Sequence, residues 1–255
     1  MRTSRERKII MKPRVPQAGI SPERYKEESA VELYDRLMRI MKKAGLLDEV
    51  INKYLEIGIR SGRVLEVACG TGNLGLEWLR ETRDTILVQL DLSPDILKKA
   101  KQNAKEYGLN NRVAHIVADA HKIPFKDNTF DGVFSHFSLH EWYEPRRVFD
   151  EIHRILRLGG RYCITDGRRD INFISKLYQQ LWIMKRVGIK MILKTMKDFN
   201  KDEVKQGFLA SINACYTVNE ISSIINETKL KEGCLVKRSD LSRGFYLEIR
   251  GEKII

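Results

Sequence analysis

A glycine-rich segment between an expected strand and an expected helix constrains this chain more than any other feature. Residues 64–67 are apolar apart from Glu66 and predict a short buried strand, and residues 73–80 predict the first turns of a helix. Gly70 and Gly72 lie between them, where the lack of a Cβ permits a tight turn and close approach of a ligand to the backbone. The free N–H groups at the helix start face this turn. The segment therefore predicts a nucleotide-type cofactor site in an α/β fold.

The type of cofactor depends on Glu66, which lies four residues before Gly70. A loop that binds a pyrophosphate gains nothing from a carboxylate at this position, whereas a cofactor with an ammonium and a sulfonium group does. Glu66 therefore favours S-adenosylmethionine (SAM) over a nicotinamide dinucleotide, although Gly-x-Gly-x-x-Gly alone fits both. The segment resembles motif I of the class I SAM-dependent methyltransferases, with Ala68 in place of the first glycine of that motif.

An acid after the second expected strand supports the same interpretation. Residues 85–90 are apolar and rich in strand-forming types, and they end at Asp91, 19 residues beyond Gly72. A carboxylate at the tip of the second strand is placed to accept hydrogen bonds from both ribose hydroxyls of an adenosine. Because both the spacing and the strand context agree, Asp91 and the glycine-rich segment together indicate an adenosine site.

Two later motifs extend the resemblance. Residues 113–117 predict a third strand, and the stretch from Asp119 to Asp131 resembles its counterpart in small-molecule methyltransferases. Residues 158–160, Leu-Gly-Gly, resemble the turn that leads into the fifth strand of the family, without its proline. The motifs span about residues 60–170 and are similar to the ubiquinone/menaquinone biosynthesis-like subgroup.

This resemblance implies a set of cofactor-binding residues. Glu66 would serve the methionine amino side, residues 68–72 the backbone cradle, and Asp91 the ribose. Asp119 would accept from the adenine amino group, and the N–H of Ala120 would address a ring nitrogen. The full set is Glu66, Ala68, Cys69, Gly70, Gly72, Asn73, Asp91, Leu92, Asp119, Ala120 and Ser135.

Catalytic candidates follow the fourth expected strand, in a segment that faces the methyl group in related proteins. Methyl transfer is an in-line displacement, so the protein mainly aligns the reactants, and a base is needed only for a nucleophile with a tightly held proton. We expect His140 or His136 to position or deprotonate the acceptor. The alternative for His140 is simple packing against a neighbouring loop. His136 and His140 beside Glu141 also have metal-ligand spacing, but the pattern is not that of zinc proteases, and no metal is predicted.

The pattern of elements predicts an α/β fold of the Rossmann-like class I methyltransferase type. A mostly parallel, seven-stranded sheet with an antiparallel strand is expected, preceded by N-terminal cap helices at residues 21–58. The methyltransferase domain is expected at residues 21–255, after a basic arm at residues 1–20. Among the expected elements are helices at 151–158 and from a Thr217 cap to about 233, and a fifth strand at 162–165.

A helical insertion at residues 171–215 bears on the substrate. It combines an apolar stripe containing Trp182 with a lysine-rich side. As a lid, it would suit a bulky apolar or amphipathic small-molecule acceptor, and its basic side would allow peripheral membrane contact. The alternatives are packing on the domain or a homodimer contact. Tyr25 or Tyr34 would line the site or be core aromatics.

The charge and the cysteine positions limit which partners, functions and compartments are expected. The net charge is +12, but lysine and arginine are spread along the chain, which favours a solvated basic surface and no nucleic-acid partner. An RNA or protein methyltransferase is the alternative function, and a SAM-binding protein without catalysis ranks last. Four widely spaced cysteines and the lack of any apolar run of about 18 residues favour a cytoplasmic protein.

Overall fold

The computed structural model describes residues 14, 28–171, 181, 185, 186, 188, 210–241 and 244–254. Its helices are α1 (Glu28–Lys43), α2 (Leu46–Glu56), α3 (Asn73–Arg80), α4 (Pro94–Glu106), the 3₁₀ helix η2 (Leu139–Glu141), α5 (Pro145–Ile155) and α9 (Val218–Ile225). Its strands are β1 (Gly62–Val67), β2 (Thr85–Asp91), β3 (Val113–Val117), β4 (Phe130–His136), β5 (Leu156–Gly167), β6 (Cys234–Arg238) and β7 (Tyr246–Glu252). Residues 210–214 are also helical.

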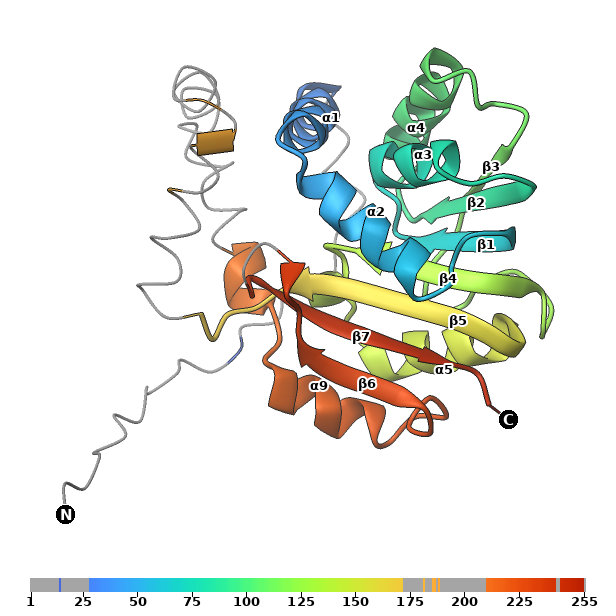
Figure 1. Cartoon of the computed structure of the whole chain (residues 1–255), viewed down its shortest axis with the longest axis vertical. Coiled ribbons are helices and arrows are strands. Elements are labelled where there is room, and N and C mark those ends of the chain that lie inside the picture. Colours follow the sequence, from blue (N-terminus) through green and yellow to red (C-terminus); the bar gives the residue numbers. More distant parts are fainter. Residues whose placement is uncertain are drawn as a thin grey trace.

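The seven strands form one sheet in the order β3-β2-β1-β4-β5-β7-β6 (Figure 1). All pairs from β3 to β5 are parallel, and β7 is antiparallel to both β5 and β6. The expected Rossmann-like class I fold is thereby confirmed. The chain runs outward from β1 to β3 and returns to β4, so the strand order reverses between β1 and β4. In open α/β sheets, ligands bind outside the carboxyl ends of the strands at such a switch point.

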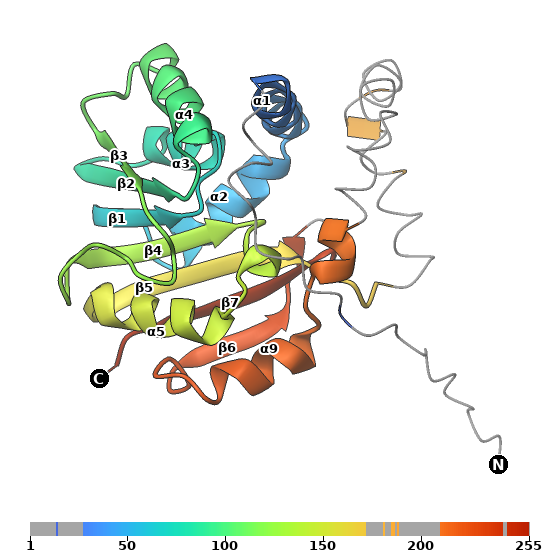
Figure 2. The ribbon, with the colours of Figure 1, turned by 180° about the vertical axis from the view of Figure 1, so that it is seen from behind.

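Helices cover both faces of the sheet, because alternate strand residues point to opposite sides. Val64 packs in a core with side chains of α2 and α3, whereas Leu65 packs in a core with side chains of α5 and α9. Figures 1 and 2 show these helix pairs on opposite sides of the sheet. Trp78 of α3 is fully buried in the first core, and its Nε1 donates to the Ile59 carbonyl at 3.0 Å.

The boundaries of α5, β5 and α9 differ from the expectation. Helix α5 starts at Pro145 rather than residue 151, since a proline at the first helical position needs no N–H partner and has a helical φ. The helix ends at Ile155, and β5 begins at the next residue, Leu156, rather than at residue 162; it includes Gly159, whose φ is +76°. Helix α9 has the expected Thr217 capping box but ends at Ile225, well before residue 233.

Two regions singled out in the sequence fall largely outside the described residues. Of the basic arm the structure describes Arg14, and of the insertion it describes residues 171, 181, 185, 186, 188 and 210–215. The lid, membrane and dimer interpretations of the insertion therefore stay predictions, as does the place of Tyr25. In the described part of the chain, every helix is too short or too polar to cross a bilayer.

Candidate active site

The glycine loop (residues 68–72) follows β1 at the switch point and is built from left-handed backbone conformations. Gly70 has φ +56° and Gly72 has φ +76°, values that glycine adopts without steric cost. Ala68 has φ +53°, which explains why the related motif has a glycine at this position. Gly72 N–H donates to the Cys69 carbonyl at 3.0 Å and closes the turn. The loop thus delivers the chain directly into the first turn of α3.

Asp91 joins the end of β2 to the glycine loop. Its Oδ2 accepts from Gly70 N at 2.9 Å, and its Oδ1 accepts from Ser93 N at 3.0 Å. Burial raises the pKa of this carboxyl above its usual value. Leu92, the next residue, leaves 43% of its surface exposed. The structure therefore brings Gly70, Asp91 and an accessible apolar side chain together at one edge of the sheet.

Glu66 lies under the loop and is 3% exposed. Its Oε2 accepts from Gln89 Nε2 at 2.7 Å, and the same amide nitrogen donates to the Gly72 carbonyl at 3.0 Å. Burial raises the pKa of Glu66 to about 8. A Cβ at Gly75 would collide with this carboxyl, so the third glycine of the motif provides space for Glu66. Gln89, which ties Glu66 to the loop, has no sequence signal of its own.

Asp119 follows β3 at the same edge as Asp91, where Ala118 N donates to the Asp91 carbonyl at 3.0 Å. The Oδ1 atom of Asp119 accepts a hydrogen bond from His121 N at 2.9 Å and lies 2.6 Å from His121 Nδ1. The side chain is 42% exposed, and Ala120 beside it is 9% exposed. His121 also stacks on Tyr143 with ring centroids 3.7 Å apart. A histidine that the sequence did not single out therefore orients Asp119.

Ser135 and His136 end β4 and are both held inside the protein. Ser135 Oγ donates to the Val67 carbonyl at 2.6 Å, which links the ends of β4 and β1 across the switch point. His136 Nδ1 lies 2.8 Å from Thr165 Oγ1, and its buried Nε2 has no hydrogen-bond partner among the residues that the structure describes. Burial lowers the pKa of His136 to about 4, so the ring is neutral and weakly basic at pH 7.

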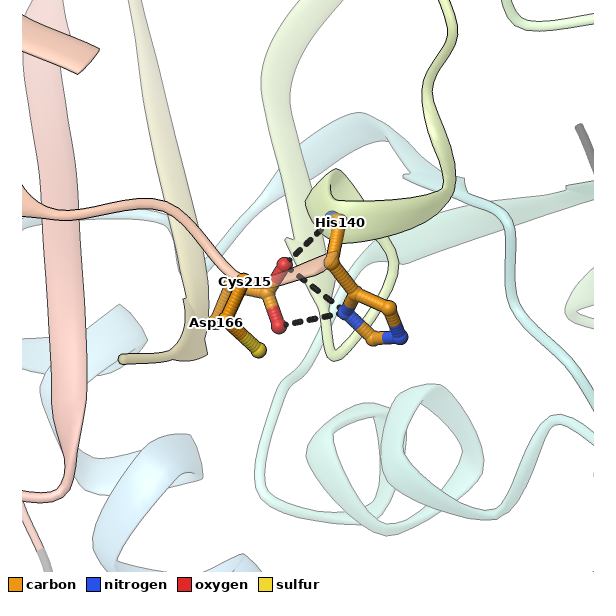
Figure 3. A group of neighbouring side chains, drawn as sticks. All are labelled: His140, Asp166 and Cys215. Atoms are coloured by element: carbon orange, nitrogen blue, oxygen red, sulfur yellow. Dashed lines mark hydrogen bonds and ion pairs between the residues drawn. The ribbon is translucent and has the colours of Figure 1, made fainter. Parts of the chain in front are cut away.

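His140 lies in η2, four residues further on, and its ring contacts the end of β5. Its Nδ1 is 2.9 Å and 3.0 Å from the two carboxylate oxygens of Asp166, and its backbone N donates to Asp166 Oδ2 at 2.6 Å (Figure 3). His140 Nε2 points away from Asp166 and lies 3.8 Å from Glu141 Oε1. Both members of the pair are buried. Asp166 was not predicted, although an acid directly after the strand expected at residues 162–165 was a usable signal.

Comparisons with known proteins agree with this geometry. Residues 65–164 match the family model described as a methyltransferase domain. This stretch of the chain is therefore similar to methyltransferase domains. The ubiquinone/menaquinone biosynthesis C-methyltransferase UbiE of Blochmanniella pennsylvanica is 32% identical to this chain over 129 residues, which are 49% of this chain and 51% of that protein. The chain thus spans about half the length of the curated relatives that it matches.

Solved structures share the fold of this chain. A Methanococcus maripaludis protein described as a candidate SAM-dependent methyltransferase has a TM-score of 0.60 at 22% identity, over 88% of this chain and 94% of that one. A SAM-dependent methyltransferase from Aquifex aeolicus has a TM-score of 0.57 at 18% identity, over 92% and 100%. At these identities the likeness shows the common architecture.

Helix α1 covers the glycine loop. The Tyr34 ring packs against Gly70, since a Cβ there would lie 2.8 Å from Tyr34 Cε1. Asp35 Oδ1 accepts from the side-chain amides of Asn73 at 2.7 Å and Asn103 at 2.6 Å. The amide nitrogen of Asn73, a predicted cofactor ligand, is thus held by α1. Asp35 was missed because its partners lie 38 and 68 residues away.

Arg14 contacts the His140 turn from the N-terminal side of the chain. Its Nε donates to the Ala214 carbonyl at 2.7 Å, and a terminal nitrogen donates to the His140 carbonyl at 3.3 Å. Its guanidinium lies 3.8 Å from the centroid of the Tyr216 ring, a cation–π distance. Three segments far apart in sequence therefore meet at the carboxyl ends of β4 and β5.

A metal site was not predicted, and the two histidines with metal-ligand spacing, His136 and His140, have different partners. The ring of His136 is directed to Thr165, whereas that of His140 is directed to Asp166. His140, Asp166 and Cys215 do present nitrogen, oxygen and sulfur atoms within 4.8 Å of one another. However, each has a partner within the protein: Asp166 accepts from Gly167 N at 2.7 Å, and Cys215 Sγ donates to the Ser211 carbonyl at 3.2 Å.

Proposed function

We propose that this protein transfers a methyl group from SAM to a small, apolar or amphipathic acceptor. The observation that carries the proposal is the hydrogen bond from Gly70 N to Asp91 Oδ2. It lies at the switch point of a class I methyltransferase fold. This bond places a ribose-binding carboxylate beside a loop whose backbone can approach a ligand closely. The sequence motifs and the match to a methyltransferase domain support the same cofactor.

Different residues around the switch point would bind different parts of the cofactor. Asp91 would accept from the ribose hydroxyls, and exposed Leu92 would pack on the adenine. Asp119, oriented by His121, would accept from the adenine amino group. Glu66 would stabilise the positive amino end of the methionine moiety, because an ionised carboxylate in a buried position gains most from a cationic ligand. The rest of the cradle is the backbone of residues 68–72.

Bound SAM supplies an activated methyl group, so the chain has to hold and align the acceptor. Of the two histidine candidates, His140 is better suited as a base. Its Nδ1 is fixed by a carboxylate, whereas burial keeps the pKa of His136 at about 4. His136 would then help to shape the site and would not transfer a proton.

An apolar acceptor is supported by the aromatic rings beside His140. Phe137 is 6.4 Å from His140, 5.3 Å from Tyr246 and 6.3 Å from Phe245, measured between ring centroids. Phe137 has φ +57°, a strained conformation for a bulky residue, and such strain clusters at functional sites. The UbiE relatives are described as ubiquinone/menaquinone biosynthesis C-methyltransferases, which agrees with an apolar small-molecule acceptor.

Methyl-labelled SAM incubated with the full chain and a host extract tests this proposal. We expect label in the organic-soluble small-molecule fraction, and strongly reduced label with Asp91→Ala run in parallel. Label in the protein or RNA fraction would overturn the acceptor class and favour an RNA or protein methyltransferase. Absence of label from every fraction, despite SAM binding, would favour the SAM-binding protein without catalysis.

A further inference from the structure

We infer that His121 is a positioning residue that gives the cofactor site its preference for an aminopurine, because the start of α5 fixes the tautomer in which His121 orients Asp119. The inference rests on the proposed function, which assigns the adenine to Asp119, and it adds the group that decides which base this carboxylate accepts. His121 follows β3, whereas α5 follows β4 and η2. Two loops from separate strands therefore meet at one imidazole.

The imidazole of His121 contacts the protein on three sides. Its Nδ1 lies 2.6 Å from Asp119 Oδ1, and its Nε2 accepts a hydrogen bond from Glu144 N at 3.3 Å. The Tyr143 ring stacks on it, with an angle of 22° between the two planes. Because the side chain of His121 is 6% exposed, water competes little for these bonds. The ring is therefore held between Asp119 and Glu144, the residue that precedes α5.

The backbone N–H of Glu144 determines the tautomer of His121. This group can only donate, so Nε2 must present its lone pair to Glu144. In a neutral imidazole the proton then lies on Nδ1, which donates it to the Asp119 carboxylate. An imidazolium would turn a second N–H toward the N–H of Glu144, so this contact disfavours the charged form. A backbone group 23 residues away thus decides which atom of His121 faces Asp119.

This arrangement leaves one oxygen of Asp119 for a ligand. Oδ1 receives two hydrogen bonds from His121, one from Nδ1 and one from the backbone N at 2.9 Å. Among the described residues no donor reaches Oδ2, and the side chain is 42% exposed. Burial raises the pKa of Asp119, but the hydrogen bonds from His121 and the charge of Arg147 together hold it below its usual value. Oδ2 is therefore an accessible oxygen that only accepts hydrogen bonds.

An oxygen that only accepts discriminates between purines. The 6-amino group of adenine can donate a hydrogen bond to Oδ2, whereas the 6-oxo group of hypoxanthine would place a second acceptor against the carboxylate. A site built to bind an N–H group rejects an analogue without it, because the polar groups of the site are then left unpaired. Since His121 holds Oδ1, it also fixes where Oδ2 lies. The preference for an aminopurine therefore depends on His121.

Calorimetric titration of the full chain with S-adenosylhomocysteine and with S-inosylhomocysteine tests this dependence. We expect the wild type to bind the adenosine compound about 100-fold more tightly. His121→Phe keeps a ring to stack on Tyr143 but has no donor for Asp119, and it should lower this ratio to less than about tenfold. His121→Asn places an amide N–H near the position of Nδ1 and should keep the ratio within about threefold of the wild type. His153→Gln, in the last turn of α5, is the control and should leave the ratio unchanged.

Nitrogen NMR of the full chain labelled in its five histidines tests the tautomer separately. The His121 signals are assigned by their loss in His121→Phe, and at pH 8 we expect the proton on Nδ1. A proton on Nε2 in the wild type would overturn the inference. Discrimination by His121→Phe equal to that of the wild type, or as large a loss in His121→Asn as in His121→Phe, would also overturn it, although the cofactor site would stand. Failure of the wild type to bind S-adenosylhomocysteine would instead contradict the proposed function, and the inference with it.

Discussion

Asp91→Ala is expected to weaken SAM binding by about 100-fold or more. The substitution removes a carboxylate that would accept from both ribose hydroxyls, and hydrogen bonds to a charged group each contribute about 1.5–3 kcal/mol. It also releases Gly70 N, so the glycine loop loses the bond that ties it to β2. Isothermal titration of the full chain with SAM measures this loss directly.

Asp95→Ala is the matched control for this variant. Asp95 lies four residues further on, in the first turn of α4, and is exposed. Its removal should change SAM affinity by less than about threefold, since surface contributions of this kind are within about 0.5 kcal/mol. Equal affinity of Asp91→Ala and the wild type would show that the ribose is held elsewhere.

SAM binding at pH 7 is expected to release about one proton from Glu66. Burial raises the pKa of this carboxyl to about 8 in the unbound chain, so it is mostly protonated at pH 7. A bound ammonium group favours the ionised form and expels the proton by linkage. Titration calorimetry in buffers of different ionisation enthalpy counts the released protons. Glu66→Gln, which has no proton to release, should give a count near zero.

The same raised pKa predicts a loss of stability at alkaline pH. The unfolded chain loses the Glu66 proton near pH 4.5, whereas the folded chain keeps it up to about pH 8. The contribution of Glu66 to the free energy of unfolding is therefore fully present below pH 4.5 and falls as the pH rises to 8, by about 4–5 kcal/mol.

Urea unfolding of wild type and Glu66→Gln at pH 5 and pH 8.5 measures this contribution. Glu66→Gln keeps the size of the side chain and should gain stability relative to the wild type as the pH rises. Exposed Glu81→Gln should follow the wild type at both values. A stability difference between Glu66→Gln and the wild type that does not change with pH would contradict a protonated, buried Glu66.

The fold and the surroundings of the cofactor could be predicted because their signals are local. The glycine loop, the strand before it and Asp91 at the end of the next strand lie within 28 residues, and each carries its own pattern. The structure places Gly70 and Asp91 in contact, although their roles toward SAM stay predictions. Even Ala68, a departure from the family motif, adopts the left-handed conformation that a glycine there would provide.

Other parts depend on contacts that sequence spacing does not reveal. The start of α5 at Pro145 and the early end of α9 follow from capping and packing rather than from apolar periodicity. Asp35 and Asp166 orient Asn73 and His140 from positions 38 and 26 residues away. Polar partners at such separations are set by the assembled sheet, so residues that position others are the ones a motif search misses.

A crystal structure of the full chain with S-adenosylhomocysteine would test the central claim most directly. In the proposed site, the ribose hydroxyls contact Asp91, and the adenine lies beside Leu92 and Asp119. The sulfur atom faces the His140 ring. A sulfur atom separated from His140 by protein side chains would contradict a base at this position. An adenosine bound away from the glycine loop would contradict the cofactor site itself.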